Sequence, residues 1–237
     1  MQPINNKHIK NLDQNYIRKD QTFRFRCTKC GEWCRNKKPE DRIILSTVDL
    51  YRIAGALEME MQDVISRYCD MAPGKESMLP LMIMKQRLDG SCIFLKKGNC
   101  TIQDNKPLVC ALYPLGRLEF LNEETGKYDF HYYLKDFRAE GCHAAEDEEW
   151  TVGQWLSRFD VESYDDCIKL YRQLGSACSK LMHSLDTDAE KKEMFGTSFY
   201  MMFVKYDRKQ PLKEQMAVNL AFIRSIRPSL FFDLAEG

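Results

Sequence analysis

The sequence predicts an α+β protein, in which a small cysteine-rich domain of short strands and helices is followed by a helical C-terminal region packed on it. Three observations predict this class. Seven of the ten cysteines lie in short, turn-rich segments between residues 27 and 142. Apolar and polar residues alternate through residues 127–134, which is the period of a strand. Apolar residues recur at three-four spacing through residues 164–185, which is the period of an amphipathic helix.

Composition narrows the function classes. The 237 residues, 44% of them hydrophobic, are enough to bury a core. The 35 basic residues balance the 35 acidic ones, so no global field attracts nucleic acid or an anionic membrane. The first residues contain no apolar run typical of a signal peptide, and no window reaches the roughly 18 apolar residues of a membrane span. We therefore expect a cytoplasmic protein with neither nucleic acid nor membrane as a partner.

The first cysteine segment runs from Cys27 to Cys34. A two-residue spacer between Cys27 and Cys30 lets both sulfurs bind one metal, and Gly31 tolerates the backbone angles of that turn. Three sulfurs do not complete a site, because structural zinc and [4Fe-4S] clusters each take about four thiolates. Basic residues flank this segment, and we interpret them as a mixture of solvent-exposed charge and thiolate stabilisation.

The remaining sulfurs come from later segments. A reducing cytosol favours metal ligation over disulfides for clustered cysteines, although the sequence alone leaves both open. The predicted cofactor is zinc or an iron-sulfur cluster, and the predicted ligands are Cys27, Cys30, Cys34, Cys92, Cys100, Cys110 and Cys142. Seven thiols exceed one four-ligand site and fall short of two, so Cys69 or His143 could supply another ligand. Three cysteines, Cys69, Cys167 and Cys178, lie in stretches that predict amphipathic helix, where cysteine usually acts as a small buried hydrophobe.

The elements of the cysteine-rich part follow from local patterns. Residues 43–45 predict a short strand, and Ser46 with Asp49 resembles a capping box that begins a helix. Residues 61–69 predict a second helix and residues 78–85 a strand. Turn residues bracket residues 92–95, which predict another short strand. Pro107 begins a helical turn that Pro114 ends, and residues 115–121 and 127–134 predict a hairpin.

The C-terminal part is predicted to be helical. We interpret the acidic residues 146–149 as a solvated run that leads into a helix at Thr151. Further helices are expected over residues 164–185, 188–206 and 211–226, followed by an aromatic tail that packs back on them. These helices could also contact a protein partner. The predicted divisions are an irregular segment 1–22, a cysteine-cluster metal-binding domain 23–145 and a helical region 146–237.

From about Phe23 to Cys142 the sequence resembles the YkgJ-like cysteine-cluster family, whose members are described as carrying a zinc- or iron-chelating domain. The family's opening C-x2-C-G-x-C-C is matched by residues 27–34, with Trp33 in place of the third cysteine. Its C-P-F-L block is similar to residues 92–95 and its C-x-I block to residues 100–102. Its R-P-x-x-C-R-x-Y-P block is similar to residues 106–114, which include Cys110. The resemblance implies metal binding with a structural, metal-handling or redox role.

Motifs of the common enzyme classes are absent, so no catalytic residue and no binding residue for an organic cofactor is predicted. Enzyme activity stays open. A flagellin lysine methylase carries a similar cysteine-cluster region, so the resemblance permits a cluster-dependent methyltransferase-like enzyme as the alternative. A third interpretation is a helical interaction module in which the metal only staples the fold.

Overall fold

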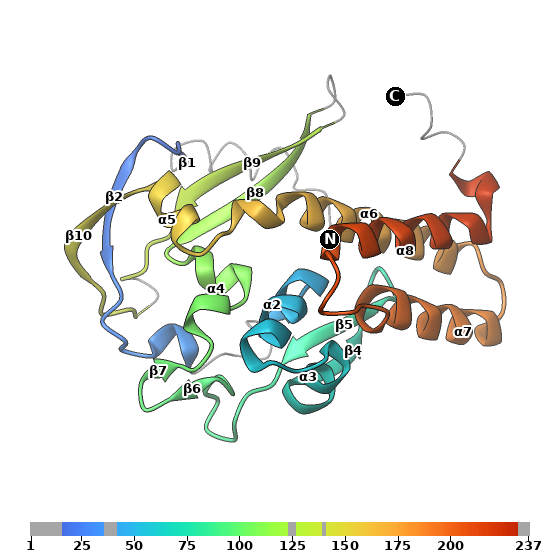
Figure 1. Cartoon of the computed structure of the whole chain (residues 1–237), viewed down its shortest axis with the longest axis horizontal. Helices are drawn as coiled ribbons and strands as arrows, with labels where there is room; N and C mark the ends of the chain where they lie inside the picture. Colours follow the sequence, from blue (N-terminus) through green and yellow to red (C-terminus); the bar gives the residue numbers. More distant parts are fainter. Residues whose placement is uncertain (1–15, 36–41, 123–126, 139–140, 232–237) are drawn as a thin grey trace. The chain divides into compact units, whose positions relative to one another are not determined.

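A computed structural model describes residues 16–35, 42–122, 127–138 and 141–231 (Figure 1). The chain forms two compact units that interleave along the sequence, Met1–Asp41 with Gln86–Ser163 and Arg42–Lys85 with Tyr164–Gly237. The sequence analysis, by contrast, divides the chain into consecutive segments. Helices and antiparallel strands occur together and the C-terminal part is helical, which confirms the α+β class.

The first unit is built from short antiparallel sheets. One has the order β1-β9-β8, a second pairs β10 with β2, and a third pairs β6 with β7. Its strands are β1 (Tyr16–Ile17), β2 (Thr22–Arg26), β6 (Leu95–Lys96), β7 (Asn99–Cys100), β8 (Leu115–Asn122), β9 (Lys127–Leu134) and β10 (Ala145–Thr151). Its helical elements are η1 (Glu32–Cys34), η3 (Gln103–Asn105), α4 (Leu108–Leu112), α5 (Val152–Arg158) and η4 (Glu162–Tyr164), the last ending at the first residue of the other unit.

The predicted hairpin is confirmed as β8 and β9, in register from Leu115 opposite Leu134 to Asn122 opposite Lys127. The predicted helix start at Thr151 is also confirmed, because the Thr151 and Gln154 side chains form a capping box at the start of α5. The irregular start predicted for residues 1–22 lies largely outside the described residues, and its described end contains β1.

Two local predictions need correction. The acidic residues 146–149 are largely exposed and precede α5, as predicted, but they belong to β10, which pairs with β2 and places Glu149 opposite Arg24. Residues 92–95 are not a strand of their own, because β6 begins only at Leu95 and Cys92 makes an isolated bridge to Gln86.

Aromatic side chains form the core of the first unit. Phe25 on β2 is 2% exposed and makes edge-on ring contacts with Tyr113, Phe137 and Trp155, at centroid distances of 5.9, 5.2 and 5.6 Å. The Trp155 indole N–H donates to the carbonyl oxygen of Leu112 at 3.1 Å, which ties α5 to α4. Strand β2 is therefore held on its buried face immediately before the first cysteine.

The second unit combines a small sheet with long helices. Its sheet has the order β3-β5-β4, and α6 packs against both α7 and α8 (Figure 1). The Ser46 and Asp49 side chains form the predicted capping box at the start of α2. The elements are β3 (Ile44–Leu45), α2 (Thr47–Leu57), α3 (Met61–Tyr68), β4 (Cys69–Pro73), β5 (Pro80–Met84), α6 (Asp165–His183), α7 (Asp188–Phe199), the π-helical η5 (Tyr200–Val204), α8 (Leu212–Ile226) and η6 (Pro228–Leu230).

The core of the second unit lies between these helices and the sheet. Leu174 and Leu181 of α6 are fully buried or nearly so, as are Phe203 of η5 and Ile223 of α8.

Among the described residues, no helix is both long enough and apolar enough to cross a membrane. Of the predicted aromatic tail, Phe231 is buried, and Phe232 lies outside the described residues.

Candidate metal centre

The first cysteine segment leaves β2 at Cys27 and ends in the short helix η1 at Cys34. Lys29 and Gly31 both adopt positive φ, 60° and 78°, which turns the chain back sharply between the cysteines. Glycine at position 31 adopts this angle at little cost because it has no Cβ. The backbone N–H of Cys34 donates to the carbonyl oxygen of Gly31 at 2.9 Å, which closes the turn.

The second cysteine segment is held by one arginine. The Arg87 guanidinium donates to the carbonyl oxygens of Cys92 at 2.8 Å, Ile93 at 2.7 Å and Leu95. A guanidinium offers five donors in a fixed plane, so it can bind several carbonyl groups of one loop at once. Cys100 follows on β7, directly opposite Leu95 in the β6–β7 pair. Cys92 and Cys100 are therefore presented by one small, internally braced hairpin.

The two segments lie against each other. The backbone N–H of Cys92 donates to the carbonyl oxygen of Cys34 at 2.7 Å. Gly98, at the β6–β7 turn, has φ 79°, and a Cβ built on it would lie 3.5 Å from the carbonyl oxygen of Lys29. These contacts join the first cysteine segment to the β6–β7 hairpin.

Electrostatics link four of the thiols. Burial, followed by smaller contributions from the nearby thiols of Cys92, Cys100 and Cys27, raises the pKa of the Cys34 thiol to about 11. Burial is also the main cause that raises the pKa of Cys92 and of Cys100. A thiol with a raised pKa is protonated at neutral pH, so a metal that binds these sulfurs must displace their protons.

Lys106 lies among the same sulfurs. This half-buried side chain places Nζ 4.2 Å from the ring centroid of Phe159. Burial lowers the pKa of Lys106, whereas the thiols of Cys110 and Cys27, followed by those of Cys100 and Cys34, raise it. Cys110 itself lies on α4, one turn after Pro107. Lys106 is thus a cation positioned to compensate thiolate charge.

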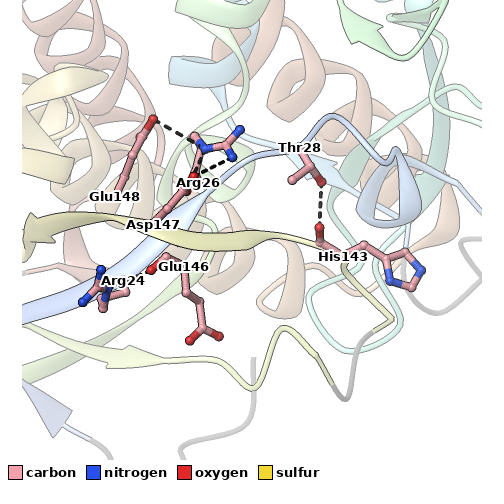
Figure 2. A network of polar contacts seen from close by, with 7 residues as sticks. All are labelled: Arg24, Arg26, Thr28, His143, Glu146, Asp147 and Glu148. Atoms are coloured by element: carbon pink, nitrogen blue, oxygen red, sulfur yellow. Dashed lines mark hydrogen bonds and ion pairs between the residues drawn. The ribbon is translucent and has the colours of Figure 1, made fainter.

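The last predicted cysteine, Cys142, is brought to the first segment by the β2–β10 pair. Figure 2 shows Arg26 of β2 reaching Asp147 and Glu148 of β10. Arg26 donates to both Asp147 carboxylate oxygens, at 2.8 and 2.7 Å, and Arg24 Nε donates to the carbonyl oxygen of Glu146 at 2.8 Å. Beyond the strands, the Thr28 hydroxyl donates to the carbonyl oxygen of His143 at 2.8 Å (Figure 2).

Cys30 and Cys142 meet just past this contact, with their sulfurs 3.9 Å apart. Burial opposes ionisation of Cys30, but hydrogen bonds involving the backbone of Glu32 and of His143 and the side chains of Cys142 and Thr28 together outweigh it and lower the pKa of that thiol. Burial raises the pKa of Cys142, and so does the nearby Cys30 thiol, whereas the Tyr113 side chain opposes the rise.

The structure thus places all seven predicted ligands in the first unit. It brings Cys34 near Cys27, Cys92 and Cys100, and it pairs Cys30 with Cys142. Among the described residues, however, no group of three or more His, Cys, Asp or Glu side chains is arranged to hold a metal ion. The ligand assignment therefore stays a prediction.

The other candidates lie elsewhere. Cys69, Cys167 and Cys178 are all buried in the second unit, where burial raises the pKa of Cys69 to about 12 and of Cys178 to about 11. Cys69 begins β4 and is not helical, contrary to the prediction for its stretch. His143 is exposed, and its backbone, not its ring, makes the contact to Thr28.

Two contributors were missed by the sequence analysis. Arg87 is separated from Cys92 by only a turn, yet nothing in its neighbours marks it as a brace for backbone carbonyls. Lys106 immediately precedes Pro107 within the block that resembles the family's R-P-x-x-C pattern, and this position was the available signal for a cation beside the thiols.

Trp33 occupies the position of the missing thiol. Its ring stacks on Tyr113 with centroids 4.3 Å apart and planes 25° from parallel, and Lys135 Nζ lies 4.6 Å from its centroid. The Trp33 side chain therefore packs the first cysteine segment against the aromatic core of the first unit.

Comparison with protein families finds a similarity in this region. Residues 26–131 match the sequence model of the CxxCxxCC family, described as "Putative zinc- or iron-chelating domain". Comparisons with curated proteins and with solved structures gave no match. The CxxCxxCC region contains six of the seven predicted ligands and ends before Cys142. Its thiol donors fit the family description, because zinc and iron-sulfur clusters both accept sites made only of thiolates.

Proposed function

We propose that the first unit binds zinc or an iron-sulfur cluster through Cys27, Cys34, Cys92 and Cys100. The observation that carries the proposal is the contact between two separate segments of the CxxCxxCC region, in which the backbone N–H of Cys92 donates to the carbonyl oxygen of Cys34 at 2.7 Å. In the same place the thiols of Cys92, Cys100 and Cys27 raise the pKa of Cys34. Four thiolates complete either kind of site.

The bound metal would join the first cysteine segment to the β6–β7 hairpin. These two segments are short and contain little regular structure, so their own hydrogen bonds give them limited stability. Arg87 orients the carbonyl groups around Cys92, and Lys106 supplies positive charge next to the thiolates. An all-thiolate zinc site is usually closed and structural, whereas an iron-sulfur cluster carries electrons, so the role would be structural or redox.

Anaerobic purification followed by metal analysis and an absorbance spectrum tests the proposal. An iron-sulfur cluster gives a broad band near roughly 400 nm, and zinc is colourless. Cys34→Ser should lower the metal content to a small fraction of the wild-type value, because the other three thiols of the proposed site all lie near Cys34. Cys178→Ser is the matched control, since Cys178 is a buried thiol in the other unit. Equal metal content in the two variants would refute the assignment.

A further inference from the structure

The outer face of α8 is apolar although it is exposed to solvent. Val218, Phe222 and Ile226 recur every four residues along it and are 61, 43 and 47% exposed. None of the exposed positions between residues 217 and 226 carries a charge. The opposite face already holds the helix in the second unit through its buried residues, which are Leu212, Met216, Asn219, Leu220 and Ile223. The outer face is therefore available to another molecule, and an apolar patch of this kind is typical of an interaction surface.

A stripe of small residues runs beside the large one. Ala217, Ala221 and Ser225 have the same four-residue spacing and are also exposed. The Ser225 hydroxyl donates to the carbonyl oxygen of Phe222 at 2.7 Å, so it is satisfied within its own helix and does not depend on water. Small side chains at a contact let two helices approach to the short end of the usual range of about 8–10 Å. The outer face can therefore pack closely against another helix.

Two charged residues at the ends of this face lack a partner within the chain. Glu214, in the first turn of α8, is exposed. Arg224, in the last turn, is half-buried, and its Nε is buried without a hydrogen-bond acceptor. In the part of the chain that the structure describes, neither residue forms an ion pair. About 15 Å of helix separates them, so they cannot reach each other within one copy.

We propose that the outer face of α8 binds the same face of a second copy of this chain, with the two helices antiparallel. A two-fold axis makes each stripe meet the same stripe of the partner, running in the opposite direction. The small stripe then packs on the partner's small stripe, with Ala221 near the axis, and the large stripe packs on the large one. Glu214 comes beside the C-terminal turn that contains the partner's Arg224, and the reciprocal contact forms at the other end. A parallel pair would instead place each of these charges near its own copy.

The dimer should be weak and reversible. Six exposed residues of each copy form the contact, compared with roughly 20–30 residues a side in a standard interface. Exposed ion pairs add little affinity, so the charges mainly fix the antiparallel orientation. We expect a dissociation constant on the order of 100 µM. The inference does not depend on a metal, because α8 belongs to the second unit.

Sedimentation equilibrium of the full-length protein, purified anaerobically and kept in reductant, tests the proposal. The wild-type protein should pass from monomer to dimer between about 10 µM and about 1 mM. Ala221→Leu adds bulk where the two small stripes meet, so it should raise the dissociation constant about tenfold or more. A surface that is only sticky would associate more strongly with the added leucine. Leu88→Lys is the control, because it removes a fully exposed apolar side chain in the first unit and should leave the constant unchanged.

A charge exchange tests the orientation. Glu214→Arg and Arg224→Glu should each weaken the dimer about three- to tenfold, because each brings like charges together, and the double variant should restore the wild-type constant. Circular dichroism and urea unfolding report whether each variant is folded. A wild-type protein that stays monomeric throughout the concentration range would refute the proposal without any variant. A dimer that Ala221→Leu leaves intact or strengthens would also refute it, as would a folded double variant that associates no better than the single ones.

Discussion

Replacing Lys106 with methionine distinguishes two effects of its positive charge. One is the cost of burying a cation in the metal-free protein, and the other is the stabilisation of thiolates in the metal-bound protein. The side chain contacts the Phe159 ring at 4.2 Å, and it lies near the thiols of Cys110 and Cys27. Methionine keeps most of the volume and removes the charge. In the metal-free protein the raised pKa values of the Cys34 and Cys100 thiols keep these two groups protonated at neutral pH, so the half-buried Lys106 faces less thiolate charge than in the metal-bound protein. In the metal-bound protein the same cation faces thiolates.

The expected magnitudes differ between the two states. In the metal-free protein the variant loses a cation–π contact of about 0.5–2 kcal/mol and gains from no longer burying a charge. These effects oppose each other, so we expect its unfolding free energy to change by less than about 2 kcal/mol. In the metal-bound protein the loss of a group that supports the ligands should weaken metal affinity about 10–100-fold, or about 1.4–2.8 kcal/mol.

Zinc affinity can be measured anaerobically by competition with a chromophoric chelator, alongside urea unfolding of the metal-free protein. Lys135→Met is the matched control, because Lys135 makes the same kind of contact, 4.6 Å from the Trp33 ring. Weakening by Lys106→Met but not by Lys135→Met supports charge compensation. Equal zinc affinity in wild type and Lys106→Met would refute the reasoning.

Two further predictions concern stability. Burial raises the pKa of Cys178 to about 11 in the folded protein. Below about pH 9 the thiol is protonated in both the folded and the unfolded state, so it causes no loss of stability. Between about pH 9 and 11 only the unfolded thiol ionises, so the unfolding free energy should fall by about 2–3 kcal/mol. Urea unfolding across that range should show a steeper loss in wild type than in Cys178→Ala, and parallel curves would contradict the cause. Gly98→Ala should destabilise by about 1–2 kcal/mol because of its φ of 79°, whereas Gly55→Ala, on an exposed helical position with no atom within 4 Å of the new Cβ, should stabilise by up to about 1 kcal/mol. Urea unfolding measures the unfolding free energy of both variants. A stability change in the same direction for Gly98→Ala as for Gly55→Ala would exclude backbone strain at Gly98.

Elements whose determinants are local could be predicted from the sequence. The capping boxes that begin at Ser46 and Thr151 involve residues three positions apart, so the pattern contains the whole interaction. The acidic residues of β10 were misjudged because their partners lie more than a hundred residues away. Without β2 beside them, residues 146–149 have only the character of solvated charge. Opposite Arg24 and Arg26 they form one edge of a strand pair.

The candidate metal centre shows the same difference between local patterns, which can be predicted, and distant contacts, which cannot. Spacing identified the thiols, because the chemistry of C-x2-C is local. Their grouping could not be predicted, since Cys30 would be expected to share a metal with its neighbour Cys27. The structure pairs Cys30 with Cys142, and this pairing depends on the distant β2–β10 contact.

Trp33 gives a physical reason for an odd number of candidate thiols. The ring at this position stacks on Tyr113, and Tyr113 lies beside Cys142, on the side of the Cys30–Cys142 pair. A cysteine at position 33, as in the family pattern, would therefore add a third sulfur next to that pair. With tryptophan there, that side holds two predicted thiols, Cys30 and Cys142, whereas the four thiols around Cys34 are those that we propose as ligands of one metal. Of the seven predicted sulfurs, Cys110 beside Lys106 is then the one outside these two groups.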